Sequence, residues 1–465
     1  PELDLAQTAL QSALDGNPRL AQVLAELDAV EARLGLPAVY ENSSVLEKTL
    51  SAQEKLLEEY ATLGGDGYPL RVRNLLLGLG LPESDLEKPL GVLSGGQKKL
   101  VGLARLLLLG PSVLLLDEPD NHLDLPGKAY LEKLIREYPG AVVIVSHDRY
   151  LLDAVVTHIA EIEEGRISTF TGDYSSYMLD KQERLARQEE LYSVQQREIG
   201  RIEASIKRLA LWGKIYDNEK FAQRAKAMQN RLDKMDKVDK PLTERRRMDL
   251  KLSGWRGSNK VLDLLALRKS FGPRCILDGV DETLWHGERV GLIGPNGSGK
   301  SVLLRLILGR ETSDAGEIRI GPSVKIGYYA QEHETLDFDQ TLIDAVRYAG
   351  NMSEARAVAF LLGYLFTYQQ AQQKIGELSG GERSRLQLAL LVLSGANFLL
   401  LDEPTNNLDI ASAEVLENAL SEFVGTVLVI SHDRYFLDRT VDRILTIEDG
   451  QLVGHLGGYS DYLAS

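Results

Sequence analysis

The sequence predicts an α/β protein in which two homologous domains are joined by a long α-helical hairpin. Three motifs recur along the chain with a constant offset of 285 residues. An apolar run at 289–293 leads into a glycine-rich loop and then into an amphipathic segment, which is the strand–loop–helix order of a nucleotide-binding sheet. Between the repeats, residues 181–251 have helical periodicity and contain no proline before Pro241.

The repeated motifs indicate that the two halves share an origin. In the first half, LSGG begins at Leu93, LLLDEP begins at Leu114 and SHDRY begins at Ser146. All three recur 285 residues later. Neither chance nor shared secondary structure is expected to keep three motifs in one register. We therefore predict homologous domains at 1–178 and 258–465, with a charged helical linker at 179–251.

The two copies differ in their first parts. The second half carries a glycine-rich loop before Gln331, whereas the first half begins near the point equivalent to the residue after this glutamine. The first copy therefore lacks a phosphate loop, and we expect a fragment or omitted residues, because half a sheet buries its core poorly. Residues 17–63, which are extra in the first copy, predict a helical arm of two amphipathic helices.

Composition and charge exclude several classes of protein. The single Cys275 excludes a disulfide framework and fits a cytoplasmic location. The most apolar run, 386–401, is shorter than the roughly 20 residues that span a bilayer, so no membrane domain is expected. Residues 181–251 contain 19 Lys and Arg against 12 Asp and Glu, a balance of +7, while the rest of the chain carries −22. Nucleic-acid binding, if present, is therefore expected at the linker.

GPNGSGKS at 294–301 predicts a phosphate-binding loop. Its glycines let backbone N–H groups surround phosphate oxygens, and the following helix adds positive potential. We expect Lys300 to reach the β- and γ-phosphates and Ser301 to bind Mg²⁺. A glycine-rich turn without function is disfavoured because a strand precedes the loop and a helix follows it. The predicted nucleotide-binding residues are Gly294, Pro295, Asn296, Gly297, Ser298, Gly299, Lys300 and Ser301.

Carboxylates and histidines follow apolar strands in both halves. Asp402 is expected to hold Mg²⁺, and Glu403 is expected to polarise the attacking water. Glu118 has the equivalent place in the first half, so hydrolysis rather than binding alone is predicted. The alternative is a buried strand with solvated acids at its end. His432 and His147 are interpreted as γ-phosphate sensors, although a lone histidine is more often structural.

Together these motifs resemble ATP-binding-cassette ATPases. Two cassettes on one chain, a charged helical linker, SHDRY after each cassette and no membrane segment resemble the ABC-F branch over essentially the whole chain. The resemblance implies that each cassette has a mixed sheet core and a helical subdomain. It also implies a monomer whose cassettes pair head to tail, with ATP held between the phosphate loop of one and the LSGG signature of the other. The signature opens a helix, so its N–H groups would face the γ-phosphate.

Residue by residue, the resemblance implies one complete ATP site. Gln331 matches the glutamine that contacts metal and water, and Ser301, Gln331 and Asp402 are the expected Mg²⁺ ligands. Phe271 is the expected adenine-stacking aromatic, with core packing as the alternative. The signature residues expected to close this site are Ser94, Gly95 and Gly96. Their counterparts at a second site, which lacks a matching phosphate loop here, are Ser379, Gly380 and Gly381. Asp120 in place of the usual Thr also predicts unequal sites.

The predicted function is that of a translation factor whose linker contacts ribosomal RNA and transfer RNA. The cations expected at RNA are Lys207, Arg208, Lys214, Lys220, Arg224, Lys226 and Arg231. The two linker helices are expected to meet near 211–218, with Gly213 and Asn218 in the turn. Trp212 and Tyr216 would then lie at the tip and stack on bases or on the RNA backbone.

Other functions stay open at this point. The linker could be a solvated hairpin held by surface ion pairs. The chain could be the ATPase subunit of a membrane exporter, but the basic linker has no role there. It could also be a DNA-maintenance ATPase, although one cysteine cannot build the zinc module that often accompanies that class. Within the ABC-F reading, antibiotic protection is possible.

Overall fold

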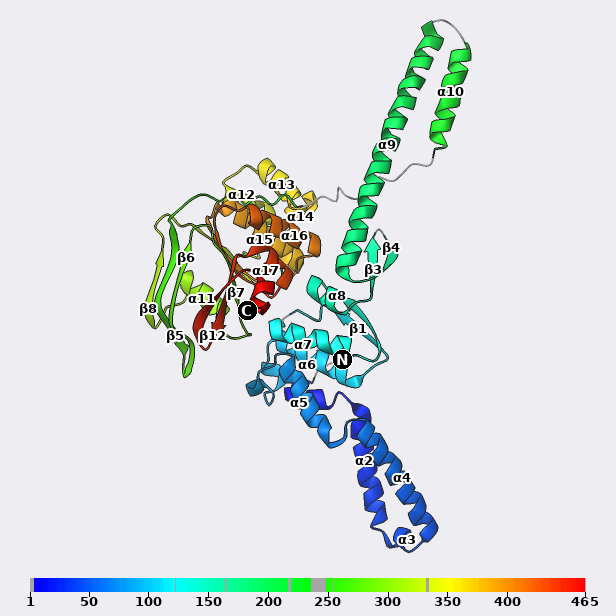
Figure 1. Ribbon diagram of the computed structural model, residues 1–465, viewed down its shortest axis with the longest axis vertical. Coiled ribbons are helices and arrows are strands. Elements are labelled where there is room, and N and C mark those ends of the chain that lie inside the picture. The colour runs from blue at the N-terminus through cyan, green and yellow to red at the C-terminus, as the bar shows by residue number, and fades with distance from the viewer. Residues whose placement is uncertain are drawn as a thin grey trace. The chain divides into compact units, whose positions relative to one another are not determined.

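A computed structural model describes residues 4–121, 123–163, 165–215, 219–235, 248–252, 254–331 and 334–464. The chain forms two compact units (Figure 1). One unit combines Pro1–Leu151 with Asp249–Ser465, and the other is Leu152–Met248. Within the first unit, we refer to the residues before the linker as the first half and to those after it as the second half.

A six-stranded sheet forms the core of the second half. Its strand order is β13-β12-β7-β11-β10-β9, and every neighbouring pair is parallel except β12–β13. The central strands β10 and β11 are buried along their whole length, as expected of parallel strands covered on both faces. The strands are β7 (Arg289–Ile293), β9 (Ile326–Tyr329), β10 (Phe398–Asp402), β11 (Thr426–Ile430), β12 (Arg443–Glu448) and β13 (Gln451–Leu456).

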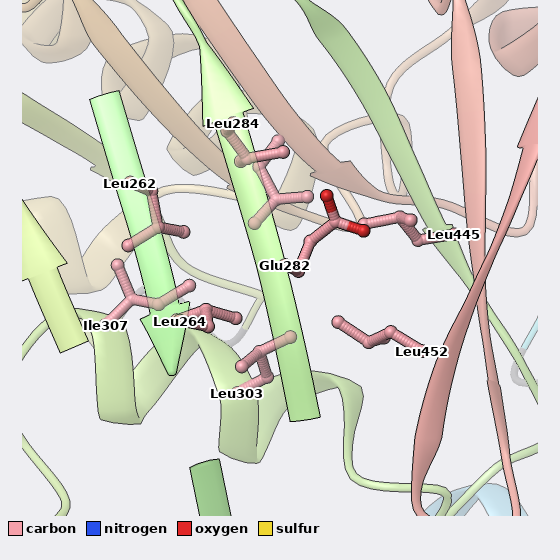
Figure 2. Close-up of a pocket in the computed structure, with 9 residues that line it drawn as sticks. Leu262, Leu264, Glu282, Leu284, Leu303, Ile307, Leu445 and Leu452 are labelled. Carbon is pink, nitrogen blue, oxygen red and sulfur yellow. The ribbon is translucent and has the colours of Figure 1, made fainter. Parts of the chain in front are cut away.

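A second, antiparallel sheet in this half packs over the helix that follows the phosphate loop. Its order is β6-β5-β8, with β5 at Lys260–Phe271, β6 at Arg274–Trp285 and β8 at Ala315–Ile320. Figure 2 shows leucines from β5, β6, β12 and β13 meeting side chains of α11 (Lys300–Ile307). Glu282 lies among these apolar side chains and pairs with Arg443 at 3.1 Å. This packing fixes α11, and with it the start of the helix at Lys300.

Helices surround the sheet and form a separate helical layer in the second half. Helix α12 packs against α13 and α15, which together form the helical subdomain that the resemblance implied. The sequence-based fold class is thus confirmed in this half. The helices are α12 (Leu342–Gly350), α13 (Glu354–Gly363), α14 (Tyr368–Ala371), α15 (Gly380–Ser394), α16 (Ile410–Glu422), α17 (Arg434–Thr440) and α18 (Tyr459–Ala464), with a 3₁₀ turn at Ile375–Glu377.

The described sheet of the first half has only two strands. Strands β1 (Val113–Asp117) and β2 (Ala141–Val145) pair in parallel, in the register that β10 and β11 repeat. Val113 and Leu115 are exposed, whereas every residue of the equivalent strand β10 is buried. The equivalent residues of β10, Phe398 and Leu400, are covered by an apolar cluster with side chains from β5, β6, β7 and α11, a segment without a counterpart in the given sequence of the first half.

Short helices and an arm complete the first half. Helices α2 (Pro18–Leu34) and α4 (Ser43–Thr62) pack against each other, and Arg19 pairs with Glu59 at 2.7 Å. The helices predicted for 17–63 are therefore present. The remaining helices are α1 (Ala9–Leu14), α3 (Pro37–Tyr40), α5 (Tyr68–Gly78), α6 (Gly95–Leu109), α7 (Leu125–Arg136) and α8 (Arg149–Val155), with 3₁₀ turns at Gly65–Gly67, Glu83–Asp85 and Leu90–Val92.

The second unit consists of a β-hairpin followed by a pair of helices. Strands β3 (His158–Glu163) and β4 (Arg166–Thr171) are antiparallel, and Lys181 at the start of α9 pairs with Glu161 of β3. Helix α9 runs over Tyr174–Ile215, and α10 runs over Glu219–Asp233 and packs against it. Gly213 lies inside α9, so the predicted turn at this glycine is wrong. Tyr216 and Asn218 lie outside the described residues.

None of the described helices is both long enough and apolar enough to cross a bilayer. The apolar run at 386–401 divides between the end of α15 and the buried strand β10, with a tight turn at Gly395. Its apolar character therefore serves the core of the second half.

Candidate nucleotide site

The predicted phosphate loop connects β7 to α11 in a conformation that requires glycine. Gly294, Gly297 and Gly299 have φ angles of 151°, 78° and 107°, in the region that L-residues with side chains rarely adopt. A Cβ atom on Gly299 would lie 2.3 Å from Cγ2 of Ile276. The glycines therefore set the loop's path, and such a path lets backbone N–H groups converge on a phosphate.

Lys300 is buried at the first turn of α11. Its Nζ atom donates hydrogen bonds to the carbonyl oxygens of Gly294 at 2.7 Å and Pro295 at 3.0 Å. Burial lowers the pKa of Lys300, and the carboxylates of Glu403, Asp124 and Asp402 act in the opposite direction. A lysine ammonium thus lies directly over the loop, where a phosphate-loop lysine binds the β- and γ-phosphates.

Asp402 ends β10 beside the loop and accepts a hydrogen bond from Ser301. Burial raises the pKa of Asp402, and Ser301 and Lys300 lower it. A carboxylate beside a hydroxyl fits Mg²⁺, which prefers oxygen ligands and takes the rest of its shell from water and phosphate. The described residues contain no cluster of three or more His, Cys, Asp or Glu that could hold a metal ion. Gln331 is exposed and follows β9, the neighbour of β10.

Glu403 is held in a strained and buried position next to His432. Its φ angle is 50°, and its Oε2 atom accepts the backbone N–H of His432 at 3.1 Å. The His432 Nε2 atom lies 3.4 Å from Glu403 Oε1. Burial, with the nearby charge of Asp402, raises the pKa of Glu403 to about 8. Burial also lowers the pKa of His432 well below its usual value, so this imidazole is neutral.

Several buried polar atoms in this site have no hydrogen-bond partner within the described chain. Such atoms are rare in folded proteins and indicate a bound group or a catalytic role. Here they lie on the loop, at the end of β10 and at the end of β11, which meet at one edge of the sheet. The atoms are Ser298 Oγ, Asp402 Oδ1, Glu403 Oε1 and His432 Nδ1. Their grouping fits a polar ligand such as a nucleotide phosphate with its metal ion.

The raised pKa of Glu403 predicts a pH dependence of activity. A general base must be deprotonated, so kcat/KM for ATP should rise with pH and level off above about 8. The folded protein favours the protonated carboxyl, so the stability contributed by Glu403 should fall as pH rises from 4.5 to about 8. Denaturant unfolding of Glu403→Gln should therefore show a stability advantage over the wild type that grows across this window. A flat activity profile from pH 6 to 9 would contradict the assignment.

The first half repeats the glutamate–histidine pair in a more open setting. Glu118 has a φ angle of 47°, and its Oε1 atom lies 3.3 Å from His147 Nε2. Burial raises the pKa of Glu118 as well. The side chain of His147 is 50% exposed, compared with 14% for His432. The two pairs share one geometry, but only the second is closed off from solvent.

A residue from the first half contacts the phosphate loop of the second half. The backbone N–H of Asn296 donates to Asp124 Oδ2 at 3.1 Å, and Asp124 Oδ1 also caps α7 by accepting the N–H of Gly127 at 3.0 Å. Asp124 was not among the predicted site residues, although it ends the repeated motif that begins at Leu114. Its position at the end of that repeated motif could have indicated a role in the site.

Both signatures open helices, as the sequence predicted. Ser94 caps α6 and Ser379 caps α15, each within a reciprocal capping box with the residue three positions later. The following glycines, Gly95 and Gly96 in α6 and Gly380 and Gly381 in α15, form the first turns. The pairing of the Ser94 signature with the phosphate loop remains a prediction.

Phe271 is the last residue of β5 and is 47% exposed, so it is not a core residue. The Nζ atom of Lys269 lies 4.9 Å from the centre of its ring. Arg274, paired with Phe271 across the hairpin, donates to the carbonyl oxygen of Gly297 at 2.8 Å. The hairpin that carries Phe271 is thus attached to the phosphate loop. Its stacking on adenine remains a prediction.

The predicted RNA-binding cations all lie on the surface of the two linker helices. All seven are exposed: Lys207, Arg208 and Lys214 on α9, and Lys220, Arg224, Lys226 and Arg231 on α10. Trp212, which is 40% exposed, lies near the end of α9 with the guanidinium of Arg208 over its ring at 5.6 Å. Its ring also contacts Phe221 of α10 edge to face at 6.0 Å.

Comparison with known proteins identifies the family. A family model described as "ABC transporter" matches residues 19–121 and 277–406, and another with the same description matches 160–252. The chain is 36% identical over 473 residues to "Energy-dependent translational throttle protein EttA" of Escherichia coli (strain K12), across 99% of this chain and 82% of the relative. The chain belongs to the ABC-F family of tandem ATP-binding-cassette ATPases.

Two relatives from Bacillus subtilis (strain 168) have less specific names. "Putative ATP-binding protein YdiF" is 37% identical over 421 residues, and "Uncharacterized ABC transporter ATP-binding protein YfmR" is 35% identical over 470 residues. The matches cover 90% and 100% of this ABC-F chain. They cover 64% of YdiF and 72% of YfmR, so the chain spans less than two thirds of the first of these relatives.

Two solved structures share the fold of this ABC-F chain. One is titled "Crystal structure of the complex of archaeal ribosomal stalk protein aP1 and archaeal ribosome recycling factor aABCE1", with a TM-score of 0.57 over 88% of this chain and 72% of that chain. The other, "RNase-L Inhibitor", has a TM-score of 0.56 over 88% of this chain and 73% of that chain. Both are 21% identical in sequence, so the likeness concerns the fold alone.

Proposed function

We propose that this ABC-F protein hydrolyses ATP at the site in its second half and uses the resulting opening and closing of its halves to act on the ribosome. The observation that carries the proposal is the meeting of Lys300, Asp402, Glu403 and His432 at one edge of the sheet, with unpartnered buried atoms among them. Asp124 of the first half accepts a hydrogen bond from Asn296 of the phosphate loop, which supports a site that both halves complete.

Each side chain has a defined role in the proposed reaction. Lys300 binds the terminal phosphates, and Glu403 accepts the proton of the attacking water. Neutral His432 donates a hydrogen bond to the γ-phosphate from its ring. Ser301 and Asp402, with Gln331, would hold Mg²⁺, which when bound would supply positive charge that offsets the charge of the phosphates. These assignments are supported by the burial of the site, which strengthens each electrostatic interaction.

Closure of the site would involve the first-half signature. The first residues of α6 follow the Ser94 cap, and a helix N-terminus presents free N–H groups and positive potential to a γ-phosphate. Such a site is intramolecular, so a monomer suffices. The pair Glu118 and His147 would serve a second nucleotide only with a phosphate loop that this sequence does not contain.

The ribosome is the proposed partner through α9 and α10. The name of EttA describes a translational throttle. In this chain, seven exposed cations lie along α9 and α10. Cations on a helical surface bind RNA phosphates, and exposed Trp212 adds an aromatic ring for stacking. An exporter subunit would leave this basic pair of helices without a role. A ribosome-binding protein of this kind acts in the cytoplasm.

Reversing the charge of the linker should weaken ribosome binding and leave ATP binding unchanged. Lys214→Glu, Lys220→Glu and Arg224→Glu together remove three phosphate contacts. The slope of log affinity against log salt should become shallower by about 2 to 3 units. Co-sedimentation with ribosomes at several salt concentrations measures the slope, and nucleotide titration measures ATP binding.

A matched reversal on the helical arm is the control. Arg33→Glu, Lys48→Glu and Lys55→Glu change the net charge by the same amount at exposed positions. We expect this variant to keep most of the salt slope. Equal losses from the two variants would show that net charge, rather than the linker surface, governs binding.

A further inference from the structure

Two buried ion pairs cross between the halves, and they are copies of each other. Arg149 at the start of α8 pairs with Glu417 of α16, and Arg434 at the start of α17 pairs with Glu132 of α7. Arg434 and Glu417 are the positions 285 residues after Arg149 and Glu132. In each half, the arginine of the SHDRY motif therefore pairs with a glutamate of the other half, and the two glutamates occupy equivalent positions.

The exposure of these side chains shows that the pairs are interior features. Exposure is 3% for Arg149 and 0% for Glu417, and it is 7% for Arg434 and 16% for Glu132. A buried ion that loses its partner is strongly destabilised, because the remaining charge is desolvated without compensation. These pairs therefore hold the halves in one relative register.

Aromatic rings of the same motif complete the contact. The guanidinium of Arg149 lies over the ring of Tyr435 at 3.8 Å, and that of Arg434 lies over the ring of Tyr150 at 5.0 Å. Cation–π contacts of this kind favour a fixed guanidinium plane. The hydroxyl of Tyr150 also bonds the carboxylate of Asp438 across the halves.

Lys128 breaks the symmetry of this interface. Its Nζ atom lies 2.8 Å from Asp148 Oδ2 and 3.9 Å from Asp120, and Asp148 Oδ1 lies 3.6 Å from Arg434. The positions equivalent to Lys128 and Asp120 are Ala413 and Thr405, so the extra cation and the extra acid occur together. A continuous ionic chain thus runs from Lys128 through Asp148 to Arg434 in one direction only.

This chain reaches the nucleotide site through the backbone. Arg434 is two residues after His432, and Asp433 between them caps α17 by accepting the N–H of Phe436 at 3.0 Å. The His432 N–H in turn bonds Glu403. In agreement with this proximity, burial and Asp402 raise the pKa of Glu403 while the charge of Lys128 opposes this rise, and Lys128 adds to the lowering of the pKa of His432 by burial and Lys300.

We propose that Arg434 is a positioning residue that the first-half carboxylates Glu132 and Asp148 hold in place, so that His432 is aligned by the opposite half. The site's turnover then depends on first-half side chains that do not touch the nucleotide. The Arg149–Glu417 pair is expected to position His147 of the first half in the same way. This inference rests on the proposed ATPase function, and its test includes a measurement that does not.

The test is a double-mutant cycle on Arg434→Met and Glu132→Gln in the full chain. Each single variant should lower kcat about tenfold with KM changed less than about threefold, and the double variant should lose little more than one single variant. The conservative variant Arg434→Lys keeps a positive charge facing both Glu132 and Asp148, and its kcat should stay within about fivefold of wild type. The same cycle in denaturant unfolding should show a coupling of about tenfold in the unfolding constant, with or without ATPase activity.

Arg439→Met is the matched control, because Arg439 also pairs with Glu417, at 3.0 Å, but from the same half and with 44% of its side chain exposed. Its kcat should stay within about twofold of wild type. Additive changes in log kcat in the Arg434–Glu132 cycle, or a loss of kcat in Arg434→Lys as large as that in Arg434→Met, would overturn the positioning role. Additive changes in the free energy of unfolding would show that Arg434 and Glu132 do not interact and would overturn the ion pair itself. A wild-type chain without ATPase activity would instead refute the proposed function, and unfolding would still test the pair.

Discussion

Glu403→Gln should lower the kcat of ATP hydrolysis by about 10³-fold while ATP still binds. General base catalysis contributes about 10² to 10⁴ to a rate, and glutamine cannot accept the proton of the attacking water. The substitution keeps the size of the side chain, and its carbonyl oxygen can still accept the His432 N–H that now bonds Oε2. The variant is therefore expected to accumulate with ATP bound and the halves closed.

Ribosome co-sedimentation tests the second consequence of this variant. A closed state that persists should raise the ribosome-bound fraction in the presence of ATP well above that of the wild type. Glu118→Gln makes the same change at the equivalent position of the first half and is expected to lower kcat less than tenfold. A Glu403→Gln variant that binds ATP but sediments free of ribosomes would rule out the translation function.

Ser94→Asp should reduce kcat/KM for ATP about a hundredfold or more, because it would place a carboxylate against the γ-phosphate. Two unit charges 4 Å apart repel by about 4 kcal/mol at an effective dielectric constant of 20. Asp is as good an N-cap as Ser, so α6 should form normally. Ser94→Asn keeps both the cap and the neutral charge, and its kcat/KM should stay within about fivefold of wild type.

Ser379→Asp makes the same substitution in the other signature, where Ser379 caps α15 in the same way. Residues 1–92 contain no phosphate-loop motif to pair with this signature, so in this 465-residue chain its effect should be less than tenfold. Steady-state ATPase assays on the three variants separate these outcomes. Similar losses for Ser94→Asp and Ser379→Asp would argue against a site that joins the first-half signature to the loop before Lys300.

The sequence motifs indicated correctly which strands and loops carry the residues of the candidate nucleotide site, whose roles stay predictions. The strand Arg289–Ile293, the loop after it and the carboxylates after β10 all lie where the motifs placed them. Local chemistry decides these features, since a phosphate loop needs glycines at particular φ angles and a buried parallel strand is apolar throughout. The three-stranded sheet β6-β5-β8 was not predicted, and its strands pair with several register shifts that local sequence patterns do not indicate.

Contacts between the halves could not be predicted from local patterns. Glu132 and Glu417 lie within ordinary amphipathic helices and belong to no motif, although the 285-residue register relates them to each other. Only the folded arrangement shows that each meets the arginine of the opposite half. At Gly213 a local pattern was overinterpreted, because the glycine was predicted to form a turn but lies inside α9. Glycine costs only about 1 kcal/mol inside a helix, which a helix as long as α9 tolerates.

The 42 residues of α9 form one uninterrupted helix, which at 1.5 Å per residue is about 63 Å long. In a helix of that length, a small rotation at one end produces a large displacement at the other. A turn of only 5° about its first residue, Tyr174, carries the end near Trp212 through roughly 5 Å, which is about the rise of one helical turn. Motions of a few tenths of an ångström at the base of the helix are thereby magnified into displacements of several ångströms at its far end.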